Sequence, residues 1–197
     1  VIFGEADIYI NAMKSLKEFS EEKSLVKPLY IFVPRAPEVF DDLFKKISES
    51  GLSVIRRSEG FSEDLQPNAS IDWNNIDVLL GDSFGEMYFY LKLCDNVVAG
   101  GGFWHTGAHN IIEQLQLHKP VTVGPEIWTI KFPAQQAEEA GLLTVVKDPS
   151  ELKSNLRLMV ESNVNDRFSR DKFAKFLKIY AGASNRALAM LENKGLI

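Results

Sequence analysis

"NVVAGGGFWHTGAHNIIEQLQLHKPVTV", residues 96–123, contains the pattern on which our prediction of the fold rests. The apolar residues 96–99 predict a β-strand, a glycine-rich loop follows, 108–118 predicts a helix that ends just before a proline, and 120–123 predicts a second strand. Strand, helix and strand in this order are the repeating unit of parallel α/β sheets. The segment therefore predicts two parallel strands joined by one helix.

The same alternation continues in both directions along the chain. Further strands are predicted at 1–4, 29–33, 52–56, 76–80 and 142–146, and further helices at about 7–20, 37–50, 84–93 and 131–140. The polar segment 57–75 is predicted to be mostly irregular. From Pro149 onward the pattern predicts helices only, at 150–163, 165–184 and 185–195. We therefore expect one domain over 1–197, with a parallel sheet and its helices over 1–148 and a helical tail over 149–197; two small lobes are the alternative.

The composition limits the classes of protein that fit. With 197 residues, 45% of them hydrophobic, the chain can bury the core of a single domain. Its net charge of -5 lacks the basic surplus of a general nucleic-acid binder. The single cysteine, Cys94, excludes a disulfide framework and is expected to be a buried thiol, since it lies in an apolar, helix-like run. No apolar run approaches the roughly 20 residues of a membrane span.

Ligands bind parallel sheets outside the carboxyl ends of the strands, so the loops that leave the strands are the candidate sites. Arg35 follows the strand at 29–33 between two prolines, and its guanidinium can bind phosphate or carboxylate; a solvated arginine in a capping turn is the alternative. Glu86 follows Gly85 at the start of a predicted helix, where the helix dipole favours a carboxylate. By itself, Glu86 is better explained as a helix-start residue than as a ligand contact.

The loop after 96–99 carries Gly100, Gly101 and Gly102 in succession. Consecutive glycines cost chain entropy on folding, so they mark backbone that needs a positive φ or a close approach by a ligand. The pattern is neither the dinucleotide-binding GxGxxG nor a Walker loop. An anion at the mouth of the helix predicted at 108–118 is the natural inference, and a flexible surface loop is the alternative.

Asn110 and Glu113 are three residues apart on that predicted helix and would share one face. If Asn110 points into a ligand cleft, Glu113 lies one turn deeper, where a carboxylate accepts hydrogen bonds from a ribose diol; a solvated glutamate is the alternative. His105, His109 and His118 do not predict a metal site, because no carboxylate or thiol joins them at ligand spacing.

Four blocks of the sequence resemble, in the same order, blocks in the C-terminal half of the Kdo transferases. They are "VPRAPEVF" at 33–40, "GDSFGEM" at 81–87, "VAGGGFWHTGAHNIIEQ" at 98–114 and "PVTVGPEIWTIKF" at 120–132. These enzymes transfer 3-deoxy-D-manno-octulosonic acid (Kdo) from CMP-Kdo to lipid A precursors in lipopolysaccharide synthesis. The resemblance covers about residues 1–190 and is most specific over 81–125.

The resemblance implies a GT-B glycosyltransferase, with this chain as its C-terminal domain: a Rossmann-like, doubly wound parallel sheet that holds the nucleotide-sugar donor. By matched position it implies that the donor is bound by Arg35, Pro37, Gly85, Glu86, Gly101, Gly102, His109, Asn110 and Glu113. It implies no metal and no cofactor. Ala36 stands where the family usually has histidine, and "GEADIY" at 4–9 replaces another family block, so no role is carried over to either.

The resemblance also implies that the catalytic base, a glutamate, lies in an N-terminal acceptor domain. This chain has no room for that domain and begins with "VIFGEAD", without methionine, so we expect a soluble fragment that binds CMP-Kdo but is inactive alone. In the full enzyme the base would deprotonate an acceptor hydroxyl that displaces CMP with inversion. The implied acceptor is a lipid A precursor, and the implied location is the cytoplasmic face of the bacterial inner membrane.

Two other interpretations remain open. The chain could be part of another nucleotide-sugar enzyme, such as a UDP-sugar epimerase or a different GT-B transferase, or a non-catalytic nucleotide-binding module. Binding of CMP but not of UDP or UMP at the glycine-rich loop would favour the Kdo transferase over the other nucleotide-sugar enzymes.

Overall fold

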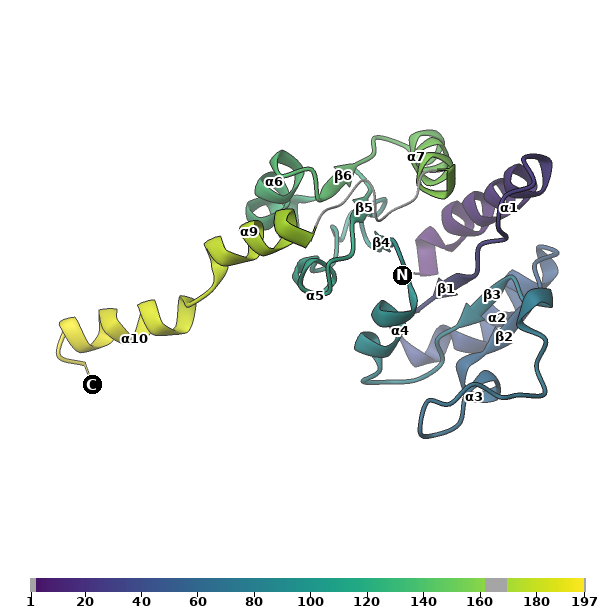
Figure 1. Cartoon of the computed structure of the whole chain (residues 1–197), viewed down its shortest axis with the longest axis horizontal. Coiled ribbons are helices and arrows are strands. Elements are labelled where there is room, and N and C mark those ends of the chain that lie inside the picture. The colour runs from purple at the N-terminus through teal and green to yellow at the C-terminus, as the bar shows by residue number, and fades with distance from the viewer. Residues whose placement is uncertain (1–2, 162–169, 197) are drawn as a thin grey trace.

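The computed structural model describes residues 3–161 and 170–196 and shows parallel strands covered by helices, with a helical C-terminal part (Figure 1). The strands are β1 Tyr30–Phe32, β2 Val54–Arg56, β3 Val78–Leu80, β4 Val97–Ala99, β5 Val121–Val123 and β6 Leu143–Val145. The α-helices are α1 Ala6–Glu22, α2 Phe40–Glu49, α3 Arg57–Gly60, α4 Met87–Leu93, α5 Ile112–Gln116, α6 Lys131–Glu139, α7 Pro149–Glu161, α9 Arg170–Tyr180 and α10 Ala183–Asn193. Four short 3-10 helices are η1 Phe3–Glu5, η2 Pro37–Val39, η3 Trp73–Asn75 and η4 Trp128–Ile130.

The strands form two parallel sheets of three, in the orders β1-β3-β2 and β4-β5-β6. In the first sheet Leu79 of β3 pairs with Ile31 of β1 on one side and with Ile55 of β2 on the other. In the second sheet Thr122 of β5 pairs with Val98 of β4. The central strands β3 and β5 are buried at every position, as their unalternated apolar sequences predict. The predicted α/β class with parallel strands is confirmed. The strands do not form one continuous sheet, however, because β1 and β4 are edge strands of separate sheets.

Each sheet has its own hydrophobic core. On the side of the first sheet, α1 buries a stripe with helical spacing, formed by Tyr9, Ile10, Met13 and Leu16. The second core is completed by α9, which buries Phe173 and Phe176 against it. Val98 of β4 and Phe103 of the following loop pack against the first core, so the two halves are in direct contact.

At the N-terminal end, the structure differs from the strand predicted at 1–4. Within the described residues, Phe3–Glu5 forms the 3-10 helix η1, which leads directly into α1. Glu5 is fully buried, and its carboxylate is held by the glycine-rich loop, which favours a turn of helix over an extended strand at this point. The predicted buried thiol is only half-buried: Cys94 lies just after α4, and burial raises its pKa.

The predicted helical tail is confirmed by α7, α9 and α10. Asp148 caps α7, since one carboxylate oxygen accepts from the backbone N–H groups of Ser150 and Glu151, both at 2.8 Å. The predicted helical positions within 162–169 lie outside the described residues. Over the ranges that are described, every helix is too short or too polar to span a membrane.

A buried aspartate directly before β3, Asp77, binds residues of α1 and of the segments before β1 and β2. The Asp77 side chain, 2% exposed, lies 2.8 Å from Nζ of Lys17 and 3.0 Å from Nζ of Lys27, and it accepts from the backbone N–H of Ser53 at 2.9 Å. Burial alone would raise the pKa of Asp77, but these donors outweigh it and lower the pKa to about 2. The charged carboxylate is therefore stabilised in the folded chain, and the cluster links α1, β3 and the residues before β2.

We expect Asp77→Asn to lower the free energy of unfolding at neutral pH by about 2 kcal/mol, the equivalent of the pKa depression. Because the folded pKa lies below the ordinary 3.8, this contribution is complete above about pH 5 and disappears as the pH falls towards 2. Urea denaturation of both proteins across this range measures it, with the exposed Asp64→Asn as the control. A stability difference that does not change with pH would contradict the assignment.

Candidate functional site

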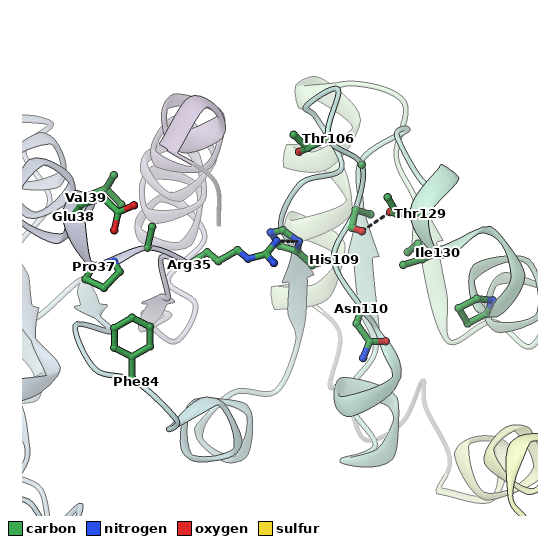
Figure 2. A pocket seen from close by; sticks show the side chains of 14 residues that line it. Arg35, Pro37, Glu38, Val39, Phe84, Thr106, His109, Asn110, Thr129 and Ile130 are labelled. Atoms are coloured by element: carbon green, nitrogen blue, oxygen red, sulfur yellow. Dashed lines mark hydrogen bonds between the residues drawn. The ribbon is translucent and has the colours of Figure 1, made fainter. Parts of the chain in front are cut away.

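A pocket of about 1010 Å³ opens where the loops that follow β1 and β4 approach each other (Figure 2). It is lined by residues 35–39, Phe84, 106–110, Thr129, Ile130 and Pro133. β1 and β4 are each an edge strand of their sheet, and the chain crosses from the first sheet to the second after β3, through α4 to β4. The carboxyl ends of parallel strands near such a change of direction are where α/β folds bind ligands. Four of the residues that the resemblance implies line the pocket, namely Arg35, Pro37, His109 and Asn110.

Arg35 and His109 reach into the pocket from opposite sides and meet there (Figure 2). Nη1 of Arg35 lies 3.5 Å from Nδ1 of His109. Burial lowers the pKa of His109, and the adjacent Arg35 guanidinium lowers this pKa further. The pocket thus pairs a permanent positive charge with an imidazole that favours its neutral form.

Nε2 of His109 is buried and has no hydrogen-bond partner among the described residues. An arginine N–H directed at Nδ1 requires that atom to be the acceptor, which puts the ring proton of neutral His109 on Nε2. Within the described part of the chain, no group of three or more His, Cys, Asp or Glu side chains is arranged to hold a metal ion.

The helix predicted at 108–118 begins later than expected. α5 starts at Ile112, whose N–H donates to Oδ1 of Asn110 at 3.1 Å. Asn110 therefore precedes the helix and lines the pocket, whereas the half-buried Glu113 lies in the first turn of α5, outside the lining residues. The prediction that Asn110 and Glu113 share a helical face is wrong, because Asn110 precedes the helix and its side chain accepts from the N–H of Ile112, the first residue of α5.

Glu86 contacts other side chains of the same half of the molecule. Its Oε1 lies 2.5 Å from Nη2 of Arg57, and its other oxygen accepts from the hydroxyl of Ser83. Glu86 directly precedes α4, but its side chain makes no capping hydrogen bond to that helix, and neither it nor Gly85 lines the pocket. Arg57, 8% exposed, was not predicted as part of the site because it opens the polar segment that we expected to be irregular.

Gly101 and Gly102 allow close approaches between backbone segments and do not themselves line the pocket. Gly101 has a φ of 87°, and a Cβ there would lie 2.2 Å from the carbonyl oxygen of Gly107. A Cβ on Gly102 would lie 2.5 Å from the backbone nitrogen of Gly124, in the loop after β5. Gly101 therefore lets the loop fold back on itself, and Gly102 lets it pack against the loop after β5.

Glu5 is the residue of this region that the sequence did not indicate. Its two carboxylate oxygens accept from the backbone N–H groups of Gly101 and Phe103, each at 2.7 Å. Amides that we expected to face an anionic ligand are thus occupied by an anion from the chain itself. Glu5 and Gly101 are 96 residues apart, so no local pattern could have linked them.

We expect Gly101→Ala to destabilise the protein by clearly more than Gly51→Ala. Both glycines have a φ of 87°, so both alanines pay the left-handed backbone cost of about 1 kcal/mol, but a Cβ at Gly51 meets no atom within 4 Å. Thermal unfolding of the two variants measures the difference. Equal destabilisation would show that the loop moves apart without cost and would contradict the close packing.

No family model matches the sequence. The chain is 34% identical over 191 residues to the 3-deoxy-D-manno-octulosonic acid transferase of Bordetella pertussis, covering 96% of this chain and 42% of that protein. It is 31% identical over 171 residues to the transferase of the same name from Haemophilus influenzae, covering 83% and 36%. The chain therefore spans less than half the length of these curated relatives.

The fold has a counterpart among solved structures. The crystal structure of the C-terminal CMP-Kdo binding domain of WaaA from Acinetobacter baumannii matches with a TM-score of 0.62 and 19% identity, over 87% of this chain and 98% of that one. The sequence matches establish the relationship, and the structural match identifies the fold. The chain therefore belongs, by sequence and by fold, with the C-terminal part of the 3-deoxy-D-manno-octulosonic acid transferases.

Proposed function

We propose that this chain binds CMP-Kdo in the pocket between the loops after β1 and β4, as the donor-binding part of a transferase that attaches Kdo to a lipid A precursor. The observation that carries the proposal is the convergence of Arg35 and His109 in one pocket. Both residues come from blocks that resemble the Kdo transferases, and the sequence similarity to such enzymes extends over nearly the whole chain.

The pocket offers the hydrogen-bond donors that a nucleotide-sugar phosphate requires. Arg35 is exposed at the pocket, and its guanidinium can form two parallel bonds to a phosphate or carboxylate. Neutral His109 accepts from this guanidinium through Nδ1 and so orients it, while its own proton lies on the buried Nε2. The side-chain amide nitrogen of Asn110 is a second donor, since within the described residues the chain engages its oxygen.

The other residues implied by the resemblance lie outside the pocket lining, and we propose supporting roles for most of them. Gly101 and Gly102 shape the loop that carries His109, and Glu86 is positioned by Arg57 near the lining residue Phe84. We propose that the carboxylate of Glu113 accepts hydrogen bonds from the ribose. This requires the ligand to extend past Asn110 towards α5.

In the whole transferase, we propose that a base from outside this chain deprotonates the acceptor hydroxyl, which then displaces CMP with inversion. Arg35 would stabilise the negative charge that develops on the departing phosphate. The chain on its own would then bind the donor without turning it over. The whole enzyme would act where its lipid acceptor is, at the cytoplasmic face of the bacterial inner membrane.

We expect CMP to perturb the backbone amide resonances of the loops at 35–39 and 106–110 when it is titrated into the ¹⁵N-labelled chain. Arg35→Ala should weaken CMP about ten- to a hundredfold, the loss typical of a hydrogen bond to a charged group. Arg186→Ala, which removes an exposed arginine from α10, is the matched control.

The competing functions give different results in the same titration. Equal affinity for CMP and UMP would indicate a different nucleotide-sugar enzyme. The absence of any shift in these loops at millimolar CMP would exclude the pocket as the donor site.

A further inference from the structure

We propose that Glu5 is a positioning residue of this pocket: its buried carboxylate holds the glycine-rich loop, and through the loop His109, in the arrangement that binds ligand. The inference rests on the proposed function, since the ligand to be tested is CMP. Glu5 itself does not line the pocket, so its effect must pass through the loop.

The carboxylate of Glu5 is fully engaged by the glycine-rich loop and does not cap the helix that it precedes. Glu5 has no exposed surface, and each of its oxygens accepts one backbone N–H at 2.7 Å, from Gly101 and from Phe103. It makes no capping hydrogen bond to α1, the helix that it precedes. A buried carboxylate without donors is very unfavourable, so any movement of the two amides away from Glu5 is strongly opposed.

The residues on either side of Glu5 are also fixed by packing. It leads into α1, where the next residue Ala6 is fully buried and Tyr9 is nearly so. The ring of Tyr9 packs edge-on against the ring of Phe103, with centroids 6.2 Å apart. At the preceding position, a Cβ on Gly4 would lie 3.0 Å from the ring of Trp104, so the loop also closes over the backbone before Glu5.

The loop transmits this anchoring to His109 through backbone hydrogen bonds. The N–H of His109 donates to the carbonyl oxygen of Gly100 at 2.9 Å, directly before the amide that Glu5 holds. The N–H of Trp104 donates to the oxygen of Gly101 at 3.1 Å, which closes the turn at the other side of that amide. Release of Gly101 would therefore displace Gly100, and with it the imidazole that lies 3.5 Å from Arg35.

The test is Glu5→Gln, which keeps the size of the side chain but places an NH₂ group opposite one of the two amides. We expect the variant to bind CMP at least about tenfold more weakly than the wild type, in line with the loss of a charged hydrogen bond. The negative charge of Glu5 raises the pKa of His109, so the variant should also show a lower His109 pKa by NMR titration. Glu18→Gln makes the same substitution at an exposed position of α1 and should change neither quantity.

Wild-type affinity for CMP in a folded Glu5→Gln variant would overturn the proposal. A loss of affinity with no change at His109 would overturn it too, because the carboxylate would then not act through this loop. If Glu5→Gln does not fold, Glu5→Asp decides the question: its charge is kept but its reach is shorter, so weaker CMP binding is expected and unchanged binding refutes the idea. If the wild-type chain does not bind CMP at all, the proposed function fails, whereas the His109 titration still tests the loop contact.

Discussion

A carboxylate that is buried away from water must have hydrogen-bond donors for its oxygens, and in this protein that requirement joins the two halves of the molecule. Glu5 belongs to the half built on the first sheet, through α1, whereas the amides that it accepts from belong to the loop leaving β4 of the second sheet. β1 and β4 are edge strands of separate sheets, so strand pairing does not fix the halves relative to each other. The carboxylate does so, together with the packing of Val98, Phe103 and the α7 residue Leu152 against the first core.

The pocket shows how a chain with a net charge of -5 can hold an anion. Arg35 supplies the permanent positive charge, but Glu38 also lines the pocket, so the site is not a uniformly basic surface. His109 favours the neutral form, because it is half-buried beside a guanidinium. Recognition of the proposed nucleotide-sugar donor would therefore depend on hydrogen-bond donors placed at particular points and not on a broad positive field.

The sequence predicted the strands, the helical tail and the loops of the site because these depend on local patterns. Six apolar runs became the six strands, and the glycines at 101 and 102 correctly marked a backbone with special requirements. Most of the failures come from long-range contacts. η1 and the role of Glu5 depend on amides nearly a hundred residues away. The late start of α5 is the exception, because it follows from a local contact in which the Asn110 side chain accepts from the N–H of Ile112. The pairing of Arg57 with Glu86 joins the first residue of α3 to the residue before α4, which no periodicity connects.

The contact between Gly102 and Gly124 has a further consequence for engineering the pocket. The two backbones approach so closely that a Cβ on either would lie 2.4–2.5 Å from a backbone atom of the other. The loops after β4 and β5 are therefore in direct backbone contact at this point. A side chain at either glycine would force both loops to move. A designer who wishes to change ligand preference should therefore leave this backbone untouched and vary the side chains displayed at the rim, such as Phe84 or Thr106, which can change in shape and polarity without altering the frame that carries them.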